Sequence, residues 1–304
     1  MQSKLMPSFA VFALLCLSAI AQMKPVAPAS SGAPCKPTVT GTVETFELPS
    51  KVFDYKRTVR VFLPPGYGDA ANRERRYPVL YMFDGQNLYD VCLAFDHVHE
   101  WQVDETVTRL VGEGKIEPLI VVGLDNAGER RAFEYLPWND NLQNAGGAQP
   151  GGQRLPEFLI QEVMPAIAAK YRVAQGRENT GIGGSSYGGI AAMYVGVEAP
   201  TVFGKVLAES PALHVGNGEI VRHTSFLAIA PQKVFVGLGG KEWDVPGANE
   251  AEVKIIRQTE ANLKAALMGP AEVKFVFDPA EIHNESAWAK RLPDALTFLF
   301  PAQK

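Results

Sequence analysis

The strongest constraint on the fold is a repeated alternation between short apolar runs and amphipathic helical segments, which begins after Tyr77-Pro78. Each run is too short for a buried helix and has no polar alternation, which is typical of strands covered on both faces. Strand followed by helix, repeated, predicts a mostly parallel sheet. The predicted strands are residues 79–83, 119–122, 206–208, 234–236 and 273–277.

Helices are predicted on both faces of this sheet. Apolar residues share one side of the segments around residues 103–111 and 253–267, and a third helix is expected over 156–171, with a kink at Pro165. Before the alternation starts, residues 39–48 and 58–63 alternate apolar and polar side chains and predict an antiparallel pair. The fold class is therefore α/β, with ligand sites expected at the carboxyl ends of the parallel strands.

The stretch GIGGSSYGGI, residues 181–190, places five glycines around two serines at a predicted strand-to-helix junction. It contains the pattern G-x-S-x-G, in which the central serine lies on a sharp turn and its neighbours two residues away approach too closely for a Cβ atom. That requirement explains Gly184 and Gly188. A phosphate-binding loop would need a lysine before its Ser or Thr, and none is present. Ser186 is the predicted nucleophile.

A serine hydroxyl needs a histidine to remove its proton and a carboxylate to orient that histidine. Of the five histidines, His283 alone follows the last predicted strand, which is the expected chain order of serine, acid and histidine. Glu242 is the preferred acid, in the loop after residues 233–238, with Asp244 as the alternative and Glu209 as a third candidate.

The negative oxygen that forms during ester cleavage needs two backbone N–H donors. One is expected from Tyr187, directly after the nucleophile, and the other from Gln86, in the turn FDGQN after the first parallel strand.

Six segments in this order resemble the putative-esterase family of the α/β-hydrolase superfamily, which includes esterase D, enterobactin-type siderophore esterases, feruloyl and acetylxylan esterases and mycolyltransferases. The resemblance covers about residues 39–300. It implies Ser186 as nucleophile, His283 as base and an acid at Glu242. The segments are YPVLYMFDGQNLYD (77–90), RRAFEYLPW (130–138), FLIQEVMPAIAAKYRV (158–173), GGSSYGG (183–189), GGKEWD (239–244) and HNESAW (283–288).

Substrate contacts are expected from side chains beside these segments, because aromatic rings can stack on a sugar or a phenolic acid and an arginine can bind a carboxylate or ester carbonyl. Packing in the core and loops is the alternative role for each ring. The candidates are Tyr135, Trp138, Trp243, Trp288 and Arg131.

The predicted function is a serine carboxylic-ester hydrolase that works through an acyl-enzyme and needs no cofactor, with carbohydrate, phenolic or siderophore esters as the candidate substrates. Acyl transfer to a sugar or lipid hydroxyl would use the same residues, and a catalytically inactive carbohydrate-binding relative is a further alternative. His97 and His99 could face one side of a strand, but no third ligand is recognisable, so no metal site is predicted.

The N-terminal residues have the pattern of an export signal. Residues 1–21 combine Lys4, a short apolar run and a small-x-small cleavage site near Ala21, and the run is too short to predict stable membrane insertion. Residues 22–37 read as a tether of low order, and 38–304 as a single domain. A secreted or periplasmic protein is therefore expected, in which Cys35 and Cys92 form a disulfide or stay as thiols.

Removal of residues 1–21 would leave 28 basic and 33 acidic side chains, because only Lys4 is lost. This mildly acidic chain has no basic run of the kind that follows a phosphate backbone, so no nucleic-acid partner is predicted.

Overall fold

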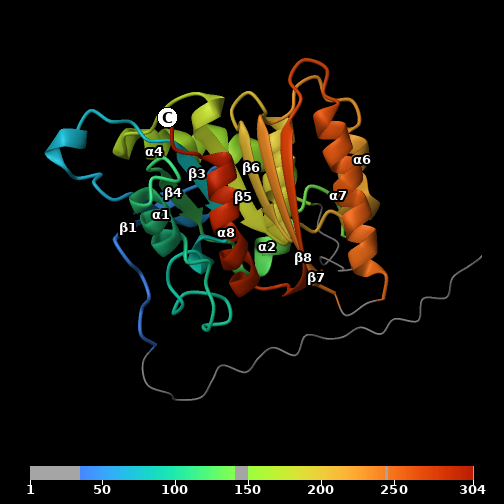
Figure 1. The fold of residues 1–304 in the computed structure, drawn as a ribbon, viewed down its shortest axis with the longest axis horizontal. Coiled ribbons are helices and arrows are strands. Elements are labelled where there is room, and N and C mark those ends of the chain that lie inside the picture. The colour runs from blue at the N-terminus through green and yellow to red at the C-terminus, as the bar shows by residue number, and fades with distance from the viewer. Residues whose placement is uncertain (1–34, 141–149, 244–245, 304) are drawn as a thin grey trace, which may run out of the picture. The chain divides into compact units, whose positions relative to one another are not determined.

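The computed structural model describes residues 35–140, 150–243 and 246–303, in which eight strands form one twisted sheet (Figure 1). Their spatial order is β1-β2-β4-β3-β5-β6-β7-β8. The strands are β1 (Thr42–Pro49), β2 (Lys56–Leu63), β3 (Val79–Phe83), β4 (Ile120–Leu124), β5 (Thr180–Ser185), β6 (Lys205–Glu209), β7 (Lys233–Lys241) and β8 (Glu272–Ile282).

Strand directions confirm the predicted fold class. β1 pairs antiparallel with β2, β2 pairs antiparallel with β4, and every later pairing is parallel. Strands β3, β4 and β5 are buried along their whole length, which is why they lack a polar alternation. The carboxyl ends of the parallel strands β5, β6 and β7 therefore lie side by side at the same end of the sheet.

Two groups of helices cover the two faces of the sheet, as predicted. α1 (Val103–Gly112) and α8 (Glu285–Leu299) bury their apolar sides against one face, and Figure 1 shows α8 crossing in front of the strands. The other face is covered by α2 (Arg131–Tyr135), α3 (Leu155–Phe158), α4 (Met164–Lys170), α5 (Tyr187–Glu198), α6 (Val215–Thr224) and α7 (Ala248–Lys264).

The segment predicted as a single kinked helix is interrupted just before its proline. A π-helical turn, Leu159–Val163, separates α3 from α4, and Pro165 lies in the first turn of α4. Proline has no N–H to give to the preceding turn, and a π-helical turn at that place changes the local hydrogen bonding.

The prediction that residues 273–277 are buried on both faces is wrong. β8 is an edge strand with β7 as its one neighbour, and Phe277 is 45% exposed.

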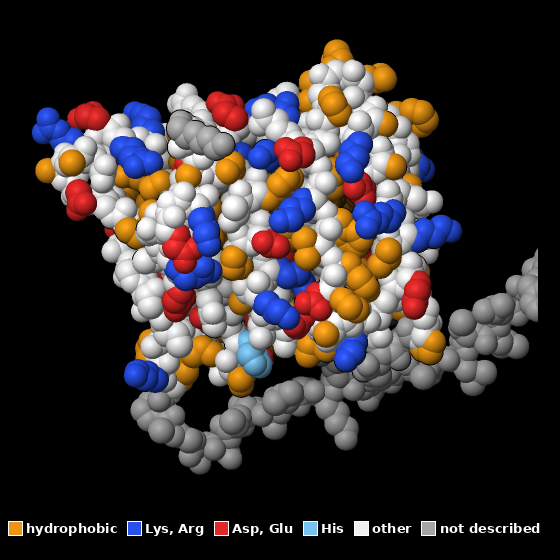
Figure 2. Space-filling view, viewed as in Figure 1, with side chains coloured by type: hydrophobic (Ala, Val, Ile, Leu, Met, Phe, Trp, Pro, Cys, Tyr) orange, Lys and Arg blue, Asp and Glu red, His pale blue; other side chains and the backbone are white. Residues whose placement is uncertain are grey.

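On the face that carries α8 and β8, Figure 2 shows basic and acidic side chains interspersed. Lys290, for example, lies 3.2 Å from Asp278 across this surface.

The predicted signal and most of the predicted tether lie outside the described residues. One compact unit begins at Lys36. Cys35 and Cys92 are disulfide-bonded, which decides the alternative left open by the sequence. Within the described ranges, no helix combines the length and apolar character needed to cross a membrane.

Candidate active site

Ser186 lies at the sharp turn between β5 and α5, with φ 57° and ψ −123°. A non-glycine residue rarely adopts this conformation, so neighbouring contacts must hold it. The Ser186 N–H donates to the Glu209 carbonyl at 3.0 Å, and the Ala212 N–H donates to the Ser186 carbonyl at 3.1 Å. The turn is thus fixed to the end of β6 and the loop that follows it.

The close approach predicted for the flanking glycines is confirmed. A Cβ atom on Gly184 would lie 2.6 Å from the Gly188 carbonyl oxygen, closer than real Cβ contacts. A Cβ atom on Gly188 would lie 3.0 Å from Asp84 Oδ2. The turn at Ser186 and the loop after β3 are therefore packed directly against each other.

His283 and Glu242 meet at the carboxyl ends of β7 and β8. His283 Nδ1 lies 2.5 Å from Glu242 Oε2, while Glu242 Oε1 accepts from Ser210 Oγ at 2.6 Å and from the Gly239 N–H at 2.5 Å. The Glu242 side chain is fully buried and the His283 ring is 22% exposed. The carboxylate therefore holds the inner ring nitrogen, and Nε2 is the nitrogen left for a reacting proton.

Burial alone would raise the pKa of the Glu242 carboxyl, but the hydrogen bond and charge of His283 and the bonds from Ser210 and Gly239 outweigh it, and the pKa is lowered. Glu242 is thus stabilised as an anion beside the imidazole ring.

The two other candidate acids occupy different positions. Glu209 accepts from Arg291 Nε at 2.8 Å, and burial raises its pKa to about 7. Its place at the end of β6 makes it a partner of Arg291, and among the described residues no hydrogen bond joins it to His283. Asp244 lies outside the described residues. Glu242 is the carboxylate that contacts His283 among those described.

The Ser186 hydroxyl makes no hydrogen bond within the described part of the chain. Its predicted bond to His283 stays a prediction. In enzymes without bound substrate, such bonds are often long and shorten only in the reacting complex.

The turn after β3 is held by several buried contacts. Asp84 adopts a left-handed conformation with φ 57°, and its N–H donates to the Tyr135 hydroxyl at 3.0 Å. Its carboxylate accepts from Arg131 Nε at 2.7 Å and Nη2 at 2.8 Å, and from Asn126 Nδ2 at 2.8 Å. Gly85 is required here, because a Cβ atom would lie 2.5 Å from the Gly123 carbonyl carbon.

The two predicted oxyanion donors lie on these two adjoining segments. Among the described residues, neither the Gln86 nor the Tyr187 N–H donates a hydrogen bond. Their side chains are used elsewhere: Gln86 Oε1 accepts from the Asn126 N–H at 3.1 Å, and the Tyr187 hydroxyl donates to Asp140 at 2.6 Å. The side-chain hydrogen bonds of Gln86 and Tyr187 thus hold these two residues in place, while their backbone N–H groups remain available to an oxyanion.

Three of the predicted substrate contacts have internal partners instead. Tyr135 is 1% exposed and supports Asp84, and Trp288 is 4% exposed and donates its indole N–H to Ser210 Oγ at 2.8 Å. Both rings are buried and their polar atoms are used internally, so their contact with a substrate stays a prediction. The Arg131 guanidinium is occupied by both Asp84 carboxylate oxygens, although its side chain is 27% exposed.

Trp138 and Trp243 are half-buried. The Trp243 ring centroid lies 5.2 Å from that of His283, whereas Trp138 packs edge-on against Tyr194. Of these two half-buried rings, Trp243 is therefore the one that lies directly beside the candidate base.

Sequence reasoning missed Ser210 and Asp84. Ser210 joins Glu242 to Trp288, and Asp84 joins Arg131 to the turn that carries Gln86. Both residues directly follow a strand, at the edge where ligand sites are expected, and that position was the one available signal.

Comparison with known proteins supports an esterase. The family described as "Putative esterase" matches residues 50–299. The Bacillus subtilis protein YbbA is 22% identical over 250 residues, which cover 80% of this chain and 92% of YbbA.

Two solved structures share the fold. The enterobactin esterase of Shigella flexneri has a TM-score of 0.65 at 18% identity, covering 90% of this chain and 63% of that one. A ferulic acid esterase of Anaeromyces mucronatus has a TM-score of 0.60 at 21% identity, covering 84% and 89%. The chain belongs to the Putative esterase family, has the α/β-hydrolase fold and is a carboxylic ester hydrolase.

Proposed function

We propose that Ser186 attacks the ester carbonyl while His283 accepts the serine proton at Nε2. The carbonyl oxygen becomes negatively charged and receives hydrogen bonds from the Gln86 and Tyr187 amides. Collapse of this intermediate breaks the bond to the alcohol, which takes the proton from His283, and leaves an acyl group on Ser186. Water then attacks the acyl group by the same steps, releasing the acid and restoring the serine.

The contact between Glu242 and His283 is the observation that supports this proposal most directly. An anion at Nδ1 keeps the proton on that nitrogen, so that Nε2 is free to accept one. It also stabilises the imidazolium that forms when Ser186 loses its proton. The lowered pKa of Glu242 keeps the carboxylate charged at neutral pH.

We propose aromatic carboxylic esters as the substrate class. The solved relatives with this fold act, by their names, on ferulic acid esters and on enterobactin. In this chain, Trp243 offers a half-buried indole ring next to His283, where the acyl ring of such an ester could stack.

A panel of matched esters tests both the proposed nucleophile and the proposed substrate class. Acetyl, feruloyl and 2,3-dihydroxybenzoyl esters of one alcohol are compared by kcat/KM with wild-type protein and with Trp243→Ala. We expect the aromatic esters to be preferred and Trp243→Ala to lower kcat/KM for them alone, while Ser186→Ala abolishes turnover of all three. An equal loss for the acetyl ester would contradict aromatic recognition, and turnover by Ser186→Ala would contradict the proposed nucleophile.

We also propose export of the chain with cleavage near Ala21. The Cys35–Cys92 disulfide supports an oxidising compartment. Expression with residues 1–34 intact, followed by intact-mass measurement of extracellular and periplasmic fractions, is expected to give a protein that begins near Gln22. An uncleaved chain in the cytoplasm would refute export.

A further inference from the structure

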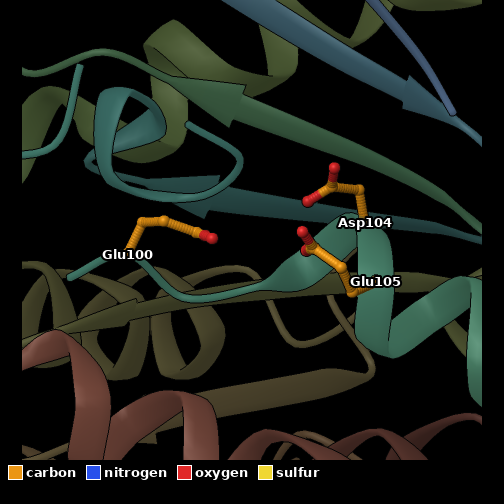
Figure 3. A group of neighbouring side chains, drawn as sticks. All are labelled: Glu100, Asp104 and Glu105. Atoms are coloured by element: carbon orange, nitrogen blue, oxygen red, sulfur yellow. The ribbon is translucent and has the colours of Figure 1, made fainter. Parts of the chain in front are cut away.

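Three carboxylates converge at the start of α1, away from the residues proposed for catalysis. Glu100 comes from the loop before the helix, and Asp104 and Glu105 from its first turn. One oxygen from each residue lies within 4.8 Å of the other two. Figure 3 shows Glu100 reaching across toward Asp104 and Glu105, with the three carboxylate groups facing a common space.

Two of the three acids are buried, Glu105 is half-buried, and the group is incompletely hydrogen-bonded. Glu100 is 5% exposed and Asp104 is fully buried. Asp104 Oδ2 accepts from the Thr40 N–H at 2.5 Å and Oγ1 at 3.1 Å, and Glu100 Oε2 accepts from the Gln102 N–H at 2.5 Å. Asp104 Oδ1 and Glu105 Oε2 are both buried and have no hydrogen-bond partner. Buried carboxylate oxygens without partners are costly, and here two occur side by side.

Within the described residues, no ion pair compensates for this charge. Among the described residues, none of the three acids takes part in an ion pair with Lys, Arg or His. The α1 dipole favours negative charge in its first turn, but Glu100 lies outside the helix.

We propose that Glu100, Asp104 and Glu105 bind one hard divalent cation, Ca²⁺ or Mg²⁺. Carboxylate oxygens are the ligands that these ions prefer, and Ca²⁺ accepts several of them in flexible geometry with water completing its shell. Asp104 Oδ1 and Glu105 Oε2 would gain the partner that they lack. A proton shared between Asp104 and Glu105 is the other way to neutralise the group, and it predicts no response to either ion.

The bound ion would fix a segment that supports the active site. Trp101, next to Glu100, donates its N–H to the Asn87 carbonyl at 2.9 Å, at the last residue of the turn that carries Gln86. Its ring centroid lies 5.6 Å from that of Trp288, and Trp288 in turn packs 5.3 Å from His283. We therefore expect the ion to stabilise the folded chain and to make no contact with the reacting atoms.

Protein treated with EDTA and then titrated with CaCl2 or MgCl2 tests the site. Calorimetry should show one ion per chain, and at about 100-fold excess over Kd the Tm should rise by roughly 5 °C. Glu105→Gln removes one ligand and one negative charge. It should lose the rise in Tm while being at least as stable as wild type in EDTA, because repulsion among the carboxylates is relieved.

Glu113→Gln is the matched control, since Glu113 follows the other end of α1 and pairs with Arg109 and Lys115 at the surface. It should keep the full response to the ion. Glu100→Gln replaces Glu105→Gln if the latter does not fold. A wild-type protein that ignores both ions, or glutamine variants at residues 100 and 105 that respond like wild type, would overturn the proposal.

Discussion

Replacing Glu242 with glutamine separates the roles of its two oxygens. Oε1 accepts from both Ser210 Oγ and the Gly239 N–H, so the introduced amide must keep its carbonyl oxygen there and turn its NH2 group toward His283 Nδ1. An N–H donor at that place forces Nδ1 to act as an acceptor. The ring proton then lies on Nε2, which can no longer receive the proton of Ser186.

The expected loss of kcat in Glu242→Gln has two sources: the lost negative charge of the carboxylate and the changed position of the imidazole proton. A carboxylate in contact with an imidazolium contributes about 4 kcal/mol at an effective dielectric constant of about 20, which corresponds to about 10³-fold in rate. The wrong tautomer adds to this loss, and the corresponding change in a serine protease lowers kcat by about 10⁴-fold. We therefore expect Glu242→Gln to lower kcat by about 10³- to 10⁴-fold with little change in KM.

The assay is steady-state hydrolysis of p-nitrophenyl acetate at neutral pH. Glu252→Gln is the matched control, because Glu252 is equally buried and lies 3.0 Å from His214 Nδ1, in a Glu–His pair without a proposed catalytic role. The control should retain activity within a few-fold of wild type. A similarly small loss in Glu242→Gln would refute the reasoning and leave Asp244 as the acid to test.

Three further perturbations test the surroundings of this pair. Ser210→Ala removes a hydrogen bond to a charged carboxylate and leaves the Trp288 indole N–H unpaired, so kcat should fall about 10-fold or more; unchanged kinetics would contradict this support role. Tyr135→Phe leaves the buried Asp84 N–H unpaired and should lower the free energy of unfolding by about 1–3 kcal/mol, as measured by urea denaturation. An unchanged free energy of unfolding would contradict the role of the Tyr135 hydroxyl in holding this turn. The pKa of Glu242 is lowered on folding, so its stabilising contribution is complete above the ordinary value of 4.5 and is lost as the pH falls through the lower folded value. The difference in unfolding free energy between wild type and Glu242→Gln should therefore shrink between neutral pH and about pH 3, and a constant difference would contradict the shift.

The sequence predicted those parts of the fold in which one physical requirement dominates. Val79–Phe83 is an uninterrupted apolar run, and it forms a strand with the predicted bounds because both of its faces are covered. Gly184 was predicted from its steric contact with Gly188, which lies four residues further along the chain. β8 was misjudged, since an apolar run cannot indicate whether a further strand will pair with its outer edge.

The roles of individual side chains were harder to predict, because they depend on whether the ring and its polar atom face the interior or the substrate. Tyr135 and Trp288 were expected to contact substrate, yet each ring is buried and its polar atom serves an internal hydrogen bond. Ser210 connects residues 32 and 78 positions away in the chain, and no local pattern encodes such contacts. The contact between His283 and Glu242 could be predicted because the order of these residues along the chain follows from the order of the strands.

The central claim is that Ser186 carries the acyl group during turnover, and covalent labelling measures this directly. The protein is treated with a fluorophosphonate, digested, and mapped by mass spectrometry, with and without prior exposure to an ester substrate. We predict one adduct per chain, on Ser186, that forms in proportion to the loss of activity, is slowed by substrate and is nearly absent in His283→Ala. Ester hydrolysis that persists with Ser186 unmodified, or an adduct on another residue that tracks the loss of activity, would contradict the account.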